Sequence, residues 1–291
     1  MQQLTDNVWT DTTLKGCNPS LVRTAGGVVV VDTPQLPTHA VELRRRAEAL
    51  GPIRFIVNTE HHVDHIFGNW WFRGAGEVVL HQGVYDNFME VRPGLDSYEF
   101  ALESVHTHDP AALAHFPDRE TYFADPNKGS IVLTGDATLH VGDHTFELLH
   151  TPGHTPGQLA VVVPQERVVF TGDTIFSECR TWLMTSDLDG WLVALDRIAA
   201  LDVDVVVPGH GPVTTLGAVA AQRAVLLAWM HAAADAVARG WSRQETIDRL
   251  ADLDRSPVDV GLESMEPYIR TANAGSLWDR YTAAQPEPAR S

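Results

Sequence analysis

Residues 58–65 read Asn-Thr-Glu-His-His-Val-Asp-His and come directly after an apolar run at 53–57. Five of these eight residues carry a carboxylate or an imidazole, the groups that a divalent cation of the zinc or iron type binds in proteins. The preceding run is rich in β-branched residues, which is typical of a strand. The sequence therefore predicts several ligand-type side chains on a loop at a strand end, where rigid scaffolds present functional groups.

Three later segments repeat this arrangement. His154 lies in Thr-Pro-Gly-His-Thr-Pro-Gly at 151–157, Asp173 follows Gly172, and His210 lies in Pro-Gly-His-Gly at 208–211, each after a β-rich run. Glycine beside each ligand lets the backbone turn and approach closely. Together the segments offer seven donors: Glu60, His62, Asp64, His65, His154, Asp173 and His210. Seven donors exceed what one catalytic ion needs and suit two adjacent ions.

The four segments, in this order, resemble the hallmark motifs of the metallo-β-lactamase fold superfamily: H-x-H-x-D-H, T-P-G-H-T-x-G, G-D and P-G-H-G. The resemblance covers about residues 7–213, including Gly16-Cys17-Asn18 and the strand that ends at Asp32. It implies an α/β fold, a four-layer αββα sandwich with the metal site at one edge. It also implies that Glu60, His62 and His154 bind one ion, that Asp64, His65 and His210 bind the other, and that Asp173 bridges them.

The sequence departs from the family motif at its first position, where Glu60 replaces histidine. Three interpretations are open. In the first, Glu60 is a ligand, and its harder oxygen donor shifts the preference of the site toward iron or manganese. In the second, His61 turns inward instead, although neighbouring side chains of an extended segment point to opposite sides. In the third, Glu60 stays out and only the second ion binds well.

Hydrophobic patterning predicts strands interleaved with helices, followed by a helical tail. Strands are expected at 28–31, 53–57, 78–80, 131–133, 145–149, 159–163, 168–170 and 203–207, and helices at 38–50, 191–201, 243–253 and 268–281. We expect residues 1–213 to form a catalytic core with a helical insertion at about 82–116, a candidate lid. Residues 214–291 are expected to form a helical C-terminal extension packed on that core.

Composition limits the partners of the protein. The chain has 21 Lys and Arg against 38 Asp and Glu, a formal net charge of −17, and its only lysines are Lys15 and Lys128. This balance argues against nucleic acid, an anionic membrane surface and a phosphate-binding loop. It also argues against a glutathione thioester, which basic residues normally hold, and favours a less charged acyl thioester, lactone or aromatic ester. Trp182 could contact such a substrate, although a structural role is equally expected.

Two cysteines and a polar segment at 1–16 favour a cytoplasmic protein without a membrane span. The sequence does not decide whether the protein forms a homo-oligomer.

Within the superfamily, the resemblance is to glyoxalase II-like hydrolases, so we expect a thioesterase or lactonase that uses a metal-bound hydroxide. Two divalent ions are expected as cofactors, zinc first and iron or manganese because of Glu60. Asp64 is the predicted catalytic residue, since it would orient the hydroxide and pass its proton to the leaving group. The alternatives are an iron-dependent oxidoreductase on the same fold and a metal-binding protein without hydrolase activity.

Overall fold

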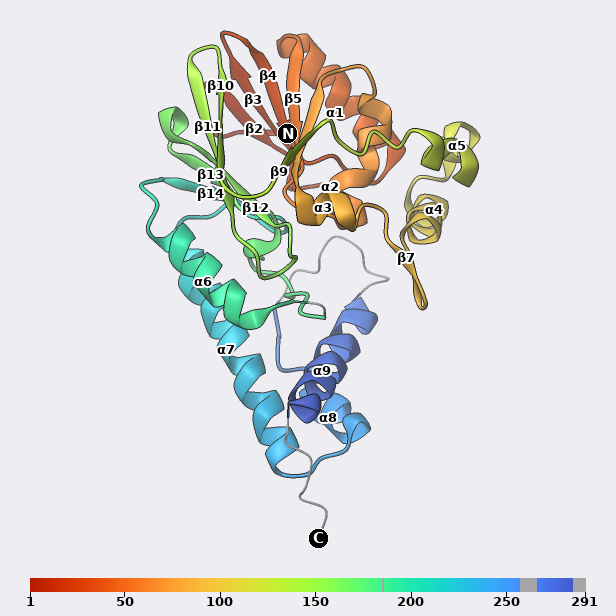
Figure 1. The fold of residues 1–291 in the computed structure, drawn as a ribbon, viewed down its shortest axis with the longest axis vertical. Coiled ribbons are helices and arrows are strands. Elements are labelled where there is room, and N and C mark those ends of the chain that lie inside the picture. The colour runs from red at the N-terminus through yellow and green to blue at the C-terminus, as the bar shows by residue number, and fades with distance from the viewer. Residues whose placement is uncertain (185, 257–265, 285–291) are drawn as a thin grey trace.

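The computed structural model describes residues 1–184, 186–256 and 266–284. They form two β-sheets packed face to face, with helices on both outer faces (Figure 1). The predicted α/β sandwich of four layers with C-terminal helices is therefore confirmed. None of the helices in the described ranges has both the length and the apolar character that a bilayer crossing requires.

The first sheet contains, within the described ranges, seven strands in the order β1-β2-β3-β4-β5-β6-β9. They are β1 (Gln2–Gln3), β2 (Val8–Thr10), β3 (Ser20–Thr24), β4 (Gly27–Val31), β5 (Ile53–Val57), β6 (Glu77–His81) and β9 (Ile131–Leu133). β4, β5, β6 and β9 are parallel neighbours. Their carboxyl ends therefore lie along one edge of the sheet.

The second sheet contains five strands in the part of the chain that the structure describes, in the order β10-β11-β12-β13-β14. They are β10 (Ala137–Val141), β11 (His144–His150), β12 (Leu159–Val163), β13 (Val168–Phe170) and β14 (Val205–Val207). β10 to β13 pair antiparallel, whereas β13 and β14 run parallel. As a result, β13 and β14 also end at a common edge.

Strands β4 and β12 are buried on both faces, which explains why they read as continuous apolar runs. Val29 of β4 and Val161 of β12 belong to the core between the sheets. Val28 packs with helix α1 (Pro37–Leu50) on one outer side, and Val162 packs with α6 (Leu188–Ala199) and α7 (Gly217–Ala238) on the other. Because side chains alternate along a strand, each of these strands contributes to two cores.

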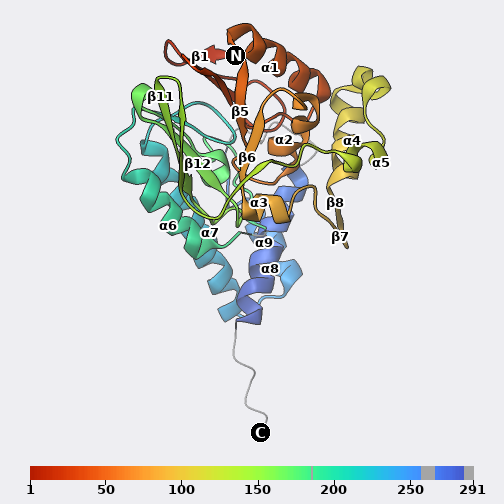
Figure 2. The same cartoon turned by 45° about the horizontal axis from the view of Figure 1, so that its top comes forward.

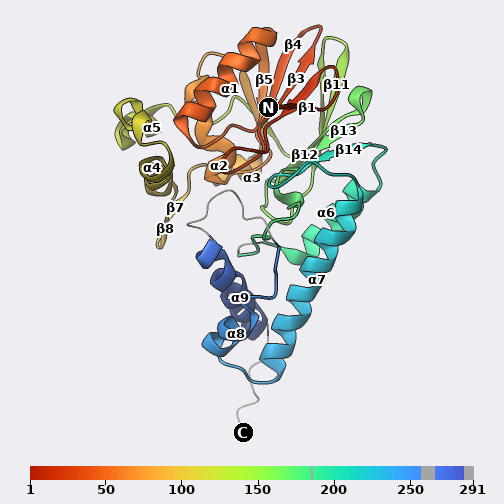
Figure 3. The ribbon, with the colours of Figure 1, turned by 180° about the vertical axis from the view of Figure 1, so that it is seen from behind.

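The outer helices extend beyond the sandwich on one side. Beside α1, the first sheet is covered by the short α2 (Val63–Ile66) and the 3-10 helix η1 (Phe67–Phe72). α6 and α7 cover the second sheet, and α7 continues past it to pack with α8 (Arg243–Leu250) and α9 (Glu266–Ala283) (Figure 3). The helices after residue 213 therefore lie on the second sheet's side and reach below the edge where the strands end.

The segment between β6 and β9 is more varied than the sequence suggests. It contains α3 (Gln82–Asp86), a hairpin of β7 (Val91–Arg92) and β8 (Leu95–Asp96), α4 (Ser97–His108), η2 (Pro110–His115) and α5 (Arg119–Ala124). Two-residue strands are too short to show a period, so the hairpin is invisible in the hydrophobic pattern. α4 and α5 stand beside the first sheet, on the side away from the second (Figure 2).

A buried histidine, His144, joins the two sheets at the end of the sandwich opposite the edge where the parallel strands have their carboxyl ends. Nδ1 of His144 lies 2.8 Å from Asp143 Oδ1, and its Nε2 lies 2.8 Å from Glu166 Oε1. Glu166 also accepts a 2.9 Å hydrogen bond from Asn7, and Asp143 accepts one of 2.8 Å from the backbone N–H of Ala25 in the β3–β4 turn. Burial lowers the pKa of His144, but the hydrogen bonds and charges of the two carboxylates outweigh it and raise the pKa.

This cluster predicts a pH-dependent contribution to stability. The unfolded imidazole titrates near its ordinary pKa of about 6.5, whereas the folded one holds its proton to higher pH. The stabilisation is therefore fully present below about pH 6.5 and is lost as the pH rises through the raised folded pKa. Urea unfolding of the native protein and of a His144→Gln variant should give a difference in unfolding free energy that shrinks with rising pH. A difference that stays constant or grows would contradict the assignment.

Candidate metal centre

The seven predicted donors all lie at the edge where the strands end. They come from five places in the chain: Glu60 and His62 from the loop after β5, Asp64 and His65 from α2, His154 from the β11–β12 loop, Asp173 from the turn after β13, and His210 from the loop after β14. In the first sheet, parallel pairing brings the strand ends to one edge. In the second sheet, the parallel pair β13 and β14 and the antiparallel β11–β12 connection reach a common edge, and the packing of the two sheets brings the two sets of loops face to face. The site is thus built where the two sheets meet.

The first group of donors consists of Glu60, His62, His154 and Asp173. One donor atom from each lies within 4.8 Å of the others. Nδ1 of His62 is 2.8 Å from Glu60 Oε2 and 3.2 Å from His154 Nε2. The ring of His154 is oriented by its other nitrogen, since Nδ1 lies 3.1 Å from the backbone carbonyl oxygen of Trp182. A proton on Nδ1 donated to that carbonyl leaves the Nε2 lone pair facing the group.

The second group consists of Asp64, His65 and His210 and lies beside the first. Nε2 of His210 is 3.3 Å from Asp64 Oδ2, and Nε2 of His65 is 3.7 Å from the same oxygen. The His210 ring stacks on Phe176 with a centroid separation of 5.4 Å. These contacts hold two imidazole nitrogens and one carboxylate toward a common point.

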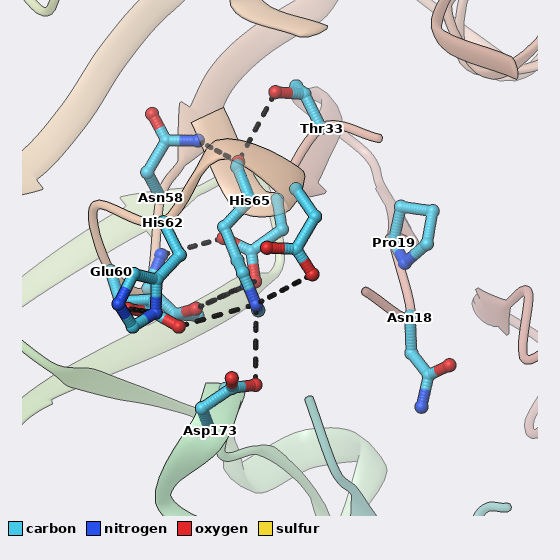
Figure 4. A network of polar contacts seen from close by, with 12 residues as sticks. Asn18, Pro19, Thr33, Asn58, Glu60, His62, His65 and Asp173 are labelled. Atoms are coloured by element: carbon cyan, nitrogen blue, oxygen red, sulfur yellow. Dashed lines mark hydrogen bonds and ion pairs between the residues drawn. The ribbon is translucent and has the colours of Figure 1, made fainter. Parts of the chain in front are cut away.

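Asp173 faces both groups. Its Oδ1 is 3.3 Å from His65 Nε2 (Figure 4). Its Oδ2 is 3.4 Å from His154 Nε2 and 3.3 Å from His210 Nε2. The carboxylate fits there only because residue 209 is glycine, since a Cβ on Gly209 would lie 1.8 Å from Asp173 Oδ1. The glycine of the fourth motif therefore makes room for the carboxylate of the third.

Residues that follow β4 and β5 hold the backbone of the first motif in place. The carbonyl oxygen of His65 accepts hydrogen bonds from the hydroxyl of Thr33, at 3.3 Å, and from Asn58 Nδ2, at 2.9 Å (Figure 4). It also accepts one from the N–H of Thr33, at 3.0 Å. α2 begins after His62, whose backbone is extended. The change from extended to helical backbone places Asp64 and His65 in a different group from Glu60 and His62.

Asp32 orients His65, a role that the sequence did not reveal. Its Oδ2 lies 2.9 Å from His65 Nδ1, and its two oxygens also accept 2.7 Å hydrogen bonds from the N–H and the hydroxyl of Thr59. With Nδ1 donating to Asp32, Nε2 of His65 presents its lone pair to the donor group. The only signal in the sequence was an acid directly after an apolar strand, as in the other motifs.

The donor set fits divalent cations. Glu60 is completely buried, with Oε2 lying 2.8 Å from His62 Nδ1, and Oε1 lying 3.4 Å from His65 Nε2 and 3.5 Å from His154 Nε2. Its carboxylate is thus enclosed by the other donors of the cluster, as Asp173 Oδ1 is by His65 Nε2 at 3.3 Å. Burying such groups without compensation is costly. The set holds imidazoles and carboxylates but no thiolate, which is typical of catalytic rather than structural metal sites. Divalent ions would satisfy each of these atoms.

Electrostatics within the cluster also favours cations. Burial would raise the pKa of Glu60, yet the imidazoles of His62 and His154 hold it well below its usual range. Burial would lower the pKa of His210, but the carboxylates of Asp173 and Asp64 raise it to about 10. The pKa values of His62 and His65 are raised as well, so without metal these three imidazoles hold protons to higher pH, and cation binding at neutral pH would displace them.

His61 belongs to neither donor group. Its ring lies 4.9 Å from that of His62, and Nδ1 is buried without a hydrogen-bond partner among the described residues. Burial and the neighbouring His62 lower the pKa of His61 to about 3, so the ring is neutral. This placement favours the interpretation in which Glu60, and not His61, takes the position of the missing histidine. The ligand assignments themselves remain predictions.

A cavity of about 540 Å³ opens onto the donor groups. Its floor includes Asp64, Asp173 and His210, and its walls come from the β7–β8 hairpin, α4, the segment after β13, and α9. Trp182 lines it, in agreement with one of the two roles considered for this residue. The contribution of α9, and the face that α4 presents to the cavity, were not predicted, because nothing in a helical period shows which face borders a cavity.

Comparison with known proteins gives consistent results. A family model described as the metallo-beta-lactamase superfamily matches residues 12–210. The chain is 28% identical over 204 residues to a beta-lactamase-like protein 2 homolog of Caenorhabditis elegans, a match that covers 69% of this chain and only 58% of that protein. It is 27% identical over 187 residues to the hydroxyacylglutathione hydrolase GloC of Haemophilus influenzae, a match that covers 62% of this chain and 79% of that protein.

Solved structures show the same fold. A metallo-beta-lactamase family protein from Thermus thermophilus aligns over 97% of this chain and 96% of its own, with a TM-score of 0.65 and 20% identity. At this identity the likeness concerns the fold alone. It includes the C-terminal helices, because the alignment extends over nearly the whole chain.

The burial of Glu60 predicts a specific defect in metal binding. Glu60→Gln keeps the side-chain volume but removes the charge, so one of two ions should be lost at limiting zinc while the other stays. The loss in affinity should exceed the roughly 10- to 100-fold that removal of an outer-shell partner typically causes. Equilibrium dialysis with elemental analysis measures this, and Glu120→Gln, on the exposed surface of α5, is the matched control. Full retention of both ions by Glu60→Gln would rule out Glu60 as a ligand.

Proposed function

Because the chain belongs to the metallo-β-lactamase superfamily, we propose that it is a dinuclear metal-dependent hydrolase that cleaves a carboxyl derivative such as a thioester, ester, lactone or lactam. The observation that carries this proposal is the pair of donor groups that share Asp173 at the floor of a cavity. A cavity of about 540 Å³ is of the size that small-molecule sites have.

We assign the ions as follows. Glu60, His62 and His154 would hold one, Asp64, His65 and His210 the other, and Asp173 would face both. Divalent ions in such a site lower the pKa of water toward neutrality and polarise a carbonyl oxygen. Two ions would bring four positive charges against the three carboxylates. One net positive charge would remain to favour an anionic nucleophile, and the carboxylate of Glu60 would widen the choice from zinc to iron or manganese.

Asp64 is the proposed proton carrier. Its side chain is 15% exposed and lines the cavity, so it reaches both the donor group and a bound substrate. A carboxylate in this place can orient a water molecule, take its proton and pass it to the leaving group. Gly16 supports this position, because a Cβ there would lie 2.8 Å from Cβ of Asp64 and its φ of +92° is unfavourable for other residues.

Replacing the proton carrier should mainly affect turnover. With saturating metal, Asp64→Asn is expected to lower kcat by about 10²- to 10⁴-fold, the usual contribution of general acid–base catalysis. Steady-state kinetics and metal analysis on the same samples separate this loss from a loss of metal. Asp6→Asn, at an exposed position, serves as the control. An Asp64→Asn variant that keeps both ions and full turnover would refute the role.

Metal removal tests the proposed reaction itself. Protein stripped by a chelator should lose hydrolysis of aryl ester, thioester and lactone substrates and regain it with zinc, manganese or ferrous iron. Oxygen uptake by the iron-loaded protein without hydrolysis would instead favour an oxidoreductase. Binding of metal with no turnover on any substrate would favour a protein that uses the site only to hold metal.

A further inference from the structure

One face of α4 lines the cavity. Asp96, which caps this helix, is followed at helical spacing by Glu99, Phe100 and Glu103, and all four border the cavity. Residues at i, i+3, i+4 and i+7 share one side of a helix. The cavity therefore has a wall with three acidic side chains around one aromatic ring.

These acids are only partly neutralised. Arg119 lies 2.9 Å from Asp96 Oδ2 and 3.5 Å from Glu99 Oε1, so one cation serves two carboxylates. Glu103 is exposed, and its carboxylate makes neither an ion pair nor a hydrogen bond with any residue that the structure describes. The α4 wall thus keeps an excess of negative charge.

The β7–β8 hairpin beside α4 does not compensate the negative charge of the α4 wall. Among the described residues that line the cavity, the one arginine is Arg92. Its Nε lies 2.8 Å from Oε1 of Glu90, another lining residue. This pair is neutral overall. At the floor, three carboxylates and an anionic nucleophile would balance two divalent ions, so the metal centre would not offset the charge of the wall.

An aromatic wall faces the same space. The ring of Trp182 lies 6.1 Å from that of His62, a proposed metal ligand, and 6.0 Å from that of Tyr268 in an edge-on arrangement. Tyr268, at the start of α9, is 49% exposed although it is a large ring. Aromatic faces attract cations, most strongly when the site is partly desolvated. The aromatic wall runs outward from the metal centre and can hold a cationic group at a distance from the reacting bond.

We propose that the substrate of this protein carries a positively charged group, an ammonium or quaternary ammonium, which binds between the acidic face of α4 and the Trp182–Tyr268 pair. The reacting carboxyl derivative would lie toward the metal centre. This inference rests on the proposed function for the reaction, but it concerns only the charge of what the cavity binds. Substrates with carboxylates are disfavoured, because they would meet uncompensated like charge.

Binding of three small probes to the zinc-loaded full chain tests the charge preference without any turnover. Phenyltrimethylammonium and tert-butylbenzene have nearly the same shape and differ by one positive charge, and benzenesulfonate supplies the negative counterpart. At low ionic strength we expect the cation to bind roughly tenfold more tightly than the neutral probe, and the sulfonate most weakly. Added salt should narrow the gap. Equal binding of cation and neutral probe, or tightest binding of the sulfonate, overturns the proposal.

A substitution on α4 locates the effect. Glu103→Gln should weaken phenyltrimethylammonium about three- to tenfold and leave tert-butylbenzene unchanged, because only the charge is removed. Glu120→Gln on α5 removes an exposed acid outside the cavity lining and should leave all three probes unchanged. An equal loss for the neutral probe would show that Glu103 acts on structure and would refute its assigned role. Calorimetry, or ligand-observed NMR for weak binding, provides the readout.

A matched set of butanoyl thioesters connects binding to reaction. Thioesters of thiocholine, of 3,3-dimethylbutanethiol and of 3-mercaptopropanesulfonate carry a positive, a neutral and a negative leaving group. We expect kcat/KM to decrease in that order. Preference for the sulfonate would overturn the charge proposal while leaving hydrolysis established. Hydrolysis of none, together with preferential binding of the cationic probe, would reject the proposed function and leave the charge proposal standing.

Discussion

Three carboxylates, those of Glu60, Asp64 and Asp173, converge at one edge of the sandwich, and the arrangement of that edge depends on keeping these like charges together. Burying them is unfavourable unless positive charge lies between them. The imidazoles of His62, His65 and His210, whose pKa values are raised by the neighbouring carboxylates, supply that charge as protons, and divalent cations would supply more of it. The scaffold must therefore be rigid enough to bring the charges together, and two sheets whose central strands, β4 and β12, are buried on both faces provide this rigidity. Glycines 172 and 209 then allow the closest approach of the loops, where any side chain would collide with Thr59 or with Asp173.

The donor side chains and the cavity walls come from different parts of the chain. The donors sit on loops that directly follow core strands, and outer-shell contacts such as Asp32 with His65 hold them. The walls come from the segment between β6 and β9, from the segment after β13 that carries Trp182, and from α9, all of which lie around the edge without belonging to either of the two large sheets. Changes in these added elements can alter the shape and charge of the cavity while the donor groups stay in place. Because donors and walls come from different segments, the arrangement of the metal donors does not dictate the acidic and aromatic character of the cavity walls.

Much of the core could be predicted from local pattern. Strands β5, β9, β12 and β13 were placed at their observed limits, because short β-branched runs bounded by turns have few other structures open to them. The hairpin of β7 and β8 could not be predicted, since strands of two residues show no period. The role of Asp32 also escaped prediction: its sequence context resembles that of a ligand, and only the packed structure places it behind His65 instead of beside the cation site. The three interpretations of Glu60 could likewise be weighed only once its buried carboxylate was seen to lie among the imidazoles of His62, His65 and His154.

The sequence by itself determined the chemistry of this protein: which residue types recur after apolar strands, in what order, and with glycines beside them. It could do so because ligand chemistry depends on side-chain type and local spacing, both of which are written along the chain. The family resemblance implied the two donor groups and the place of Asp173 between them, but only the tertiary structure brings these side chains together and makes α4 and Tyr268 border the same cavity. These facts depend on contacts between residues far apart in sequence, and such contacts follow from the packing of sheets and helices, which no local pattern records.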